Sequence, residues 1–135
     1  MRLTQSKVLG GLVFAHAVLG FAWQLWISRG DHGVSIPVTL VALAVLGITG
    51  AVGVLQHRRF GLYLVPLFYL AQVAQVVAPG FVLSLYLLYK VDFTIGFEFG
   101  TLGVNLLAAA MFLWSSLYAA GVLDSADALQ ADSRA

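Results

Sequence analysis

Long apolar runs alternate with short polar stretches along this 135-residue chain. Four runs approach the length of about 20 mostly apolar residues that a helix needs to cross the hydrocarbon core of a bilayer. None of these four runs contains Asp, Glu, Lys or Arg. The pattern predicts an all-α membrane protein, a four-transmembrane-helix bundle in one integral membrane domain, with helices at about 8–27, 36–55, 60–78 and 100–122.

Local signals set the expected helix ends. Ser35 is suited to cap the second helix, and Pro37 falls in its first turn, where the missing N–H costs nothing. Pro79 and Gly80 are expected to stop the third helix. Ala15 to Ala17 resembles a signal-peptide cleavage site, but cleavage there would leave an apolar core of only seven residues, so the first helix is expected to be retained. The polar stretch 124–135 is expected to form a C-terminal tail.

The segment 81–99 has a different period. From Val91 to Phe99 apolar residues alternate with Asp92, Thr94, Gly96 and Glu98, which is the period of a strand with two unlike faces. Joined through Tyr89 and Lys90, the arms 81–89 and 91–99 predict a short β-hairpin on the outer side, between helices three and four. An alternative is that helix three continues to Tyr89, but that helix would be about 45 Å long, well beyond the bilayer core.

The basic residues predict the orientation of the chain. With the N-terminus inside, five of the seven lie on the cytoplasmic side and two on the outer side, and the turn with Arg58 and Arg59 contributes most to this bias. We therefore expect an integral protein of a bacterial-type plasma (inner) membrane with both termini cytoplasmic. Trp23 and Trp26 then fall at the outer interface and Tyr118 near the inner one, as aromatic belts prefer. Arg58 and Arg59 are expected to touch anionic lipid.

Composition excludes several classes of function. Hydrophobic residues make up 61% of the chain and charged residues 10%, and the net charge of +1 provides no patch for nucleic acid. There is no Cys, so thiolate catalysis and Cys-based metal sites are excluded. The expected helices also lack the embedded carboxylate of an ion-coupled carrier. We expect no catalytic residues, no metal and no cofactor.

Neutral polar residues inside the expected helices are the remaining candidates for a site. Counted from the helix midpoints, three of them share one depth toward the outer side, a fourth lies slightly deeper, and His16 is near the centre of helix one. One interpretation is hydrogen bonding between helices that fixes their register. Another is an outward-open pocket for a small polar head group, and a third is contact with a partner subunit. The five residues are Gln24, Gln72, Gln75, Asn105 and His16.

Small residues predict close helix packing. Gly11 and Ala15 in helix one, and Gly47 and Ala51 in helix two, are four residues apart, a spacing that lets helix backbones approach. This motif is equally compatible with packing inside one bundle and with an interface between protomers.

His16 is expected to be a packed residue rather than a metal ligand. The other two histidines, His32 and His57, belong to loops on opposite sides of the membrane, so the three cannot meet at one ion.

The expected function follows from the missing reactive groups and from an aromatic surface. We predict an accessory or scaffolding subunit that binds a partner membrane protein or lipid, and whose partners include membrane lipids and a second membrane protein or further copies of the chain. The alternative is a small oligomeric channel, carrier or binder of a lipophilic or amphipathic molecule. The aromatic residues expected to dock the partner are Phe81, Tyr86, Tyr89, Phe93, Phe97 and Phe99.

Overall fold

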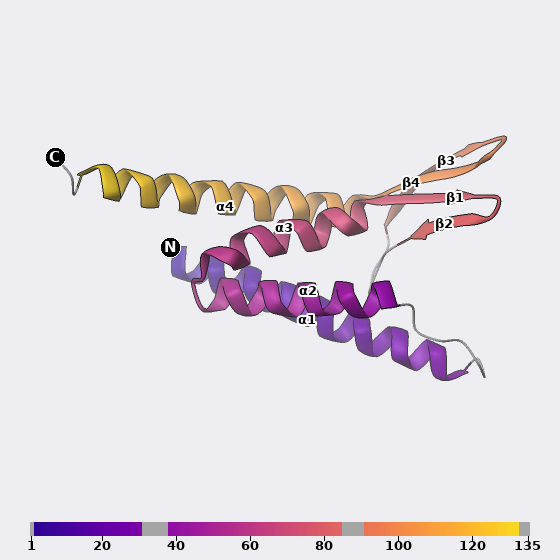
Figure 1. Ribbon diagram of the computed structural model, residues 1–135, viewed down its shortest axis with the longest axis horizontal. Coiled ribbons are helices and arrows are strands. Elements are labelled where there is room, and N and C mark those ends of the chain that lie inside the picture. The colour runs from indigo at the N-terminus through magenta and orange to yellow at the C-terminus, as the bar shows by residue number, and fades with distance from the viewer. Residues whose placement is uncertain (1, 31–37, 85–90, 133–135) are drawn as a thin grey trace.

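A computed structural model describes residues 2–30, 38–84 and 91–132, which form four helices and four strands. The two longest helices, α1 and α4, lie at the two ends of the element order, and the strands lie between α3 and α4 (Figure 1). The helices are α1 (Arg2–Gly30), α2 (Val38–Leu55), α3 (Arg59–Val73) and α4 (Leu106–Asp132). The strands are β1 (Ala74–Ala78), β2 (Phe81–Ser84), β3 (Asp92–Phe97) and β4 (Gly100–Asn105).

Each helix packs against the next helix along the chain. The extensive helix interfaces are α1 with α2, α2 with α3 and α3 with α4, and no interface of comparable extent joins α1 to α4. Figure 1 shows the strands extending from one end of the helices, while the start of α1, the α2–α3 turn and the end of α4 lie toward the other end. The bundle is therefore open on the side between its first and last helices.

The core lies along α2 and the inner faces of its neighbours. Leu9, Val13 and Ala17 are buried at intervals of four residues, so they form one stripe along α1. Phe68 and Tyr69 of α3 are fully buried, and their rings pack edge to face with centroids 4.9 Å apart. These residues fix the depth at which α1 and α3 meet.

Glycines of α2 allow this close packing. A Cβ atom on Gly47 would lie 2.6 Å from Phe68 Cε2 and 2.9 Å from Ala17 Cβ, so no larger residue fits without movement. The small residues of α2 are thus used inside the bundle. Gly11 of α1 differs, because nothing lies within 4 Å of the Cβ position there. The prediction of close packing inside the bundle is confirmed for α2, whereas Gly11 lies on the exposed surface of α1, and its use at an interface between protomers stays a prediction.

A Schellman-type turn connects α2 to α3. His57 has a φ of 55°, the left-handed conformation that commonly follows the last turn of a helix. The N–H of Arg58 donates to the carbonyl of Gly53 at 2.8 Å, and the N–H of His57 donates to that of Val54 at 3.1 Å. The turn satisfies carbonyl groups that the end of α2 would otherwise leave free.

The expected third helix at 60–78 is wrong in its second part. The helix ends at Val73, and 74–78 form strand β1, which pairs with strands on both of its sides. Two β-branched residues in β1, Val76 and Val77, suit a paired strand. At 15 residues, α3 is about 22 Å long and shorter than a bilayer core. Pro79 and Gly80 do not stop a helix but form the two-residue turn from β1 to β2, with Gly80 at φ 78° as in a type II turn.

The expected fourth helix at 100–122 begins later than predicted. Residues 100–105 form strand β4, and α4 starts at Leu106. Gly100 and Gly103 are poor helix formers, and Asn105 is a preferred residue before a first helical turn. Among the described residues, three segments are long and apolar enough to cross a membrane: Gln5–Ile27, Val38–Leu55 and Leu106–Leu123.

The predicted strand period is confirmed, but the predicted pairing is wrong. Asp92–Phe97 is a strand, as the alternation indicates, and Phe81–Ser84 is another. They do not pair with each other, since the antiparallel sheet has the order β2-β1-β4-β3 and places them at opposite edges. Two short turns after β1 and β3 close local hairpins, which leaves β1 and β4 to pair in the centre. The expected turn at Tyr89 and Lys90 lies outside the described residues, and a helix running from 60 to 89 is also wrong.

Candidate functional site

The sheet has one polar and one apolar face. Successive residues of a strand point to opposite faces, and residues paired across strands share a face. Asn105 pairs with Asp92, Gly103 with both Thr94 and Gln75, and Thr101 with Gly96 and Val77, so this face is mostly polar. The opposite face carries the pairs Val104 with Phe93, Leu102 with Ile95 and Leu102 with Val76.

Along β4 the apolar face is the more exposed one, whereas on β3 both faces are exposed. Along β4, Leu102 is 44% exposed, whereas the next polar-face residue, Gly103, is buried. Phe93, Phe97 and Phe99 are also exposed, Phe99 to 79%. A shallow groove of about 220 Å³ lies near the end of this face, between Val76 and Ala78 of β1 and the two aromatic residues Phe97 and Phe99. Apolar surface of this extent on a small protein marks an interaction site.

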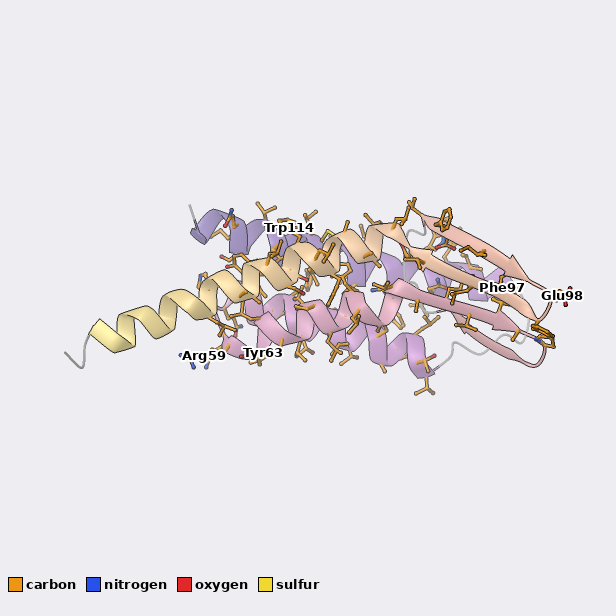
Figure 2. The ribbon with its side chains drawn as sticks, turned by 90° about the horizontal axis from the view of Figure 1, so that it is seen from above. Arg59, Tyr63, Phe97, Glu98 and Trp114 are labelled. Atoms are coloured by element: carbon orange, nitrogen blue, oxygen red, sulfur yellow. The ribbon has the colours of Figure 1, made fainter. Side chains whose placement is uncertain are left out.

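The predicted docking residues fall in different parts of the chain. Phe93, Phe97 and Phe99 belong to β3 and to the turn that follows it. Figure 2 shows Phe97 and Glu98 at the far end of the sheet, and Arg59 toward the opposite end of the molecule. Phe81 begins β2, where its backbone pairs with Ala78. Tyr86 and Tyr89 lie outside the described residues.

The predicted polar layer is divided between helices and sheet. Gln72 is buried, and its side chain donates to the carbonyl of Phe68 one turn earlier, at 3.1 Å. Asn105 is only 4% exposed, and its Oδ1 accepts a hydrogen bond from the N–H of Ala108 at 3.2 Å, so it caps the start of α4. Gln75 lies half-buried in β1 and Gln24 half-buried on α1. These two hydrogen bonds are local, one within α3 and the other at the start of α4.

His16 takes part in a different group of residues. Its ring lies 5.7 Å from that of Phe68 and 5.6 Å from that of Tyr69, measured between centroids. The Nε2 atom of His16 and the hydroxyl of Tyr69 are buried, and neither has a hydrogen-bond partner in the described part of the chain. Buried polar groups without a partner are rare in folded proteins, so this pair requires an explanation.

A cavity of about 250 Å³ adjoins these two residues. It lies between α1 and α4 on the open side of the bundle, with Tyr69 of α3 contributing to the wall. The remaining wall is apolar, and it carries no charged side chain. Its lining residues are Leu12, Ala15, His16, Leu19, Tyr69, Leu107 and Met111.

Tyr69 was not among the residues that the sequence indicated. Its hydroxyl is concealed in an apolar helix, and aromatic residues in such helices usually serve packing. The depth count gives a usable signal, since Tyr69 is near the middle of the third apolar run as His16 is near the middle of the first. Polar residues at the same depth on different helices are candidates to lie close together in the folded bundle.

A metal site is not found in the described part of the chain. Within 2–30, 38–84 and 91–132, no group of three or more His, Asp or Glu is placed to hold a metal ion. Arg58 and Arg59 are exposed at the α2–α3 turn. Searches of protein-family models, of curated proteins and of solved structures find no match to this chain.

Proposed function

We propose that the protein is a non-enzymatic accessory subunit of a bacterial-type plasma membrane, which docks a partner membrane protein through the apolar face of its sheet. The observation that carries this proposal is that the apolar face of the sheet is exposed. Its polar face is the more buried one along β4, whereas its apolar face is exposed, with Phe93 close to the helices and Phe97 and Phe99 at the far end of the sheet. An exposed apolar sheet face of this kind is typical of a surface that a partner covers.

The helices support placement in a membrane. Three segments have the length and hydropathy of a span, and their outward residues are apolar, including Leu19 of α1, Val45 of α2 and Leu117 of α4. In water these side chains would form an apolar surface around the whole bundle. In a bilayer they meet lipid chains. The remaining crossing is made by α3, about 22 Å long, because β1 lies beside β4 and shares its depth outside the core.

The charge distribution supports an orientation with both termini in the cytoplasm. Lys7 lies near the start of α1, and Arg58 and Arg59 lie at the α2–α3 turn. Figure 1 shows both of these segments at the end of the bundle opposite the sheet. Positive residues concentrate on the cytoplasmic side of membrane proteins. Trp23 and Trp26 belong to the last turns of α1, on the side of the sheet, where an interfacial aromatic belt is expected. The sheet therefore faces the outer side.

The length of the strands favours a protein partner over lipid. The apolar part of α4, Leu106–Leu123, is about 27 Å long and nearly fills the hydrocarbon core of about 30 Å. Strands β3 and β4 continue from its start in the same general direction for about 20 Å (Figure 1). The head groups add only about 5–8 Å on each side of the core. Phe97 and Phe99 thus reach beyond the lipid, where only a protein can cover them.

Photocrosslinking on the two faces of β3 tests this proposal. The photoreactive residue p-benzoylphenylalanine is introduced at Phe93, on the apolar face, or at the adjacent Thr94, on the polar face, and native membranes are irradiated. Both positions are exposed, so they differ mainly in the face that they report. We expect one discrete adduct with a second protein from position 93, and a similar adduct from position 99. Position 94 is expected to give none.

A second variant connects the adduct to the apolar face. The change Phe97→Ser with Phe99→Ser removes exposed side chains, so the melting temperature in detergent is expected to stay unchanged while the adduct at position 93 is lost. Leu117, exposed on α4 within the bilayer, is the control for non-specific reaction. Equal adducts from positions 93 and 94 would contradict the proposal. So would adducts made only of two copies of this chain, which would identify a homodimer interface instead.

A further inference from the structure

The cavity between α1 and α4 has the size and lining of a ligand site. Its volume of about 250 Å³ exceeds the roughly 150 Å³ of an apolar protein cavity that binds benzene. It is smaller than a site for a whole drug-sized molecule, about 300–1,000 Å³. A single substituted ring or a short chain fits this volume.

The polar atoms at this cavity are held in place by packing. The His16 ring packs edge to face on Phe68 and at a tilt on Tyr69, and both α3 residues are fully buried. The His16 Nε2 and Tyr69 hydroxyl groups nevertheless have no hydrogen-bond partner among the described residues. Each group therefore retains bonding capacity for a guest in the cavity.

We propose that this cavity binds the ring or short chain of a membrane-soluble molecule that carries one hydroxyl group, with His16 and Tyr69 as the hydrogen-bonding residues. A hydroxyl donates one hydrogen bond and accepts others, so it suits a Tyr hydroxyl and either tautomer of a neutral His. A carbonyl group accepts hydrogen bonds but donates none, so it suits only the His tautomer that carries a proton on Nε2. An ionised head group is excluded, because no charged side chain lines the cavity to compensate for the cost of burial.

The open side of the bundle provides the entry route. Leu12 and Leu19 of α1 and Leu107 of α4 line the cavity and are also exposed at the surface of the bundle. His16 is at the midpoint of the apolar segment Gln5–Ile27. In the proposed membrane placement, a molecule dissolved in the bilayer reaches the cavity sideways between α1 and α4. The inference rests on that placement but not on docking at the sheet.

Binding of 1-naphthol and naphthalene to the full-length chain in lipid nanodiscs tests the inference. These probes share one ring system and differ by a single hydroxyl group. The ring nitrogens of the three histidines are observed by ¹⁵N NMR, and His16→Phe assigns the His16 signals. We expect 1-naphthol to shift the His16 Nε2 resonance saturably, with about fivefold higher affinity than naphthalene after correction for partition into lipid. His32 and His57 report non-specific effects.

Three variants locate the site. Tyr69→Phe removes only the hydroxyl and is expected to weaken 1-naphthol binding about fivefold without changing the affinity for naphthalene. Ala15→Phe places a ring in the cavity and is expected to abolish binding of both probes while the melting temperature is kept. Val18→Phe adds the same ring at an exposed position of α1 that does not line the cavity, and binding is expected to be unchanged.

Each contrary result overturns the inference. Equal affinities for 1-naphthol and naphthalene would show an apolar cavity that does not recognise a hydroxyl group. A His16 Nε2 signal that is already hydrogen-bonded without probe, and that does not move on addition, would assign the cavity to water. Unchanged binding in Ala15→Phe would place the probe elsewhere. All of these measurements use the chain alone, so their failure is distinct from failure to find a docking partner.

Discussion

The α2–α3 interface and the α1–α4 side are built from similarly apolar helices but pack in opposite ways. Between α2 and α3, glycines let the backbones approach, and a Cβ atom on Gly53 would lie 2.8 Å from the Cα of Gly61. Between α1 and α4 a cavity of about 250 Å³ is lined by three Leu, His16, Tyr69 and Met111, with Ala15 as its one small lining residue. Hydrophobicity alone does not distinguish these two sides. The size of the side chains does.

This difference separates stability from binding. The α2–α3 interface supplies dense packing, which tolerates little change in volume. The α1–α4 side lacks such contacts and can accept a guest without separating packed helices. The candidate ligand site therefore lies where the bundle is least complete, and substitutions on the two sides are expected to have unlike effects.

The largest expected effect is on the glycine at the start of α3. In Gly61→Leu the new Cβ would overlap the backbone of α2 at Gly53 and Val54, which cannot move aside as a side chain does. We expect a loss of more than about 3 kcal/mol in the free energy of unfolding, or no folded protein at all. The measurement is thermal and denaturant unfolding in detergent, followed by circular dichroism. Gly11→Leu, on the open surface of α1, is the matched control and should change stability by less than about 0.5 kcal/mol.

A smaller loss is expected from a single methyl group between three helices. Gly47→Ala places a carbon 2.6 Å from Phe68 and 2.9 Å from Ala17, so α1 or α3 must shift. The expected cost is about 1–3 kcal/mol, despite the better helix propensity of Ala. Gly11→Ala gains that propensity without a clash and should be neutral or slightly stabilising. Similar unfolding midpoints for the two variants would show that the α2 interface is looser than described.

The start of α4 should respond to loss of its cap. Because α4 packs extensively only on α3, its first turn depends on Asn105, whose side chain accepts the hydrogen bond from the Ala108 N–H. Asn105→Ala is expected to cost about 1 kcal/mol, and Asn105→Asp, which keeps an acceptor, considerably less. Hydrogen exchange at the amide of Ala108 measures the local effect. Equal exchange in the two variants would assign the role of Asn105 to the sheet instead.

The smallest expected effect is a gain at the α2–α3 turn. His57 adopts a left-handed conformation that costs a residue with a Cβ atom more than it costs Gly. His57→Gly is expected to raise the free energy of unfolding by about 0.5 kcal/mol, because the relief of strain exceeds the added freedom of the unfolded chain. His57→Val should lower it. A rise in the midpoint for Val would mean that the turn changes conformation.

Local patterns in the sequence predicted the elements whose stability is local. The uncharged runs that became α1 and α2 were identified because a helix satisfies its own backbone within a continuous segment. The alternation in Asp92–Phe97 predicted a strand, since a two-faced strand has a period of two. The candidate residues Asn105 and His16 were also visible, but their roles as helix cap and cavity residue were not.

Only the tertiary structure decided where α3 ends, where α4 begins and which strands pair. Residues 74–78 and 100–105 are apolar enough to continue their helices, and they become strands because they pair with each other, although the paired residues are 24 to 30 positions apart in the chain. Such pairing depends on contacts between residues that are far apart in the sequence, so a short stretch of sequence does not reveal it. The same reason hides the cavity, because Tyr69 and His16 belong to different helices. The sequence determined an apolar, multi-helix chain with one two-faced strand, and packing decided which of its surfaces remain open.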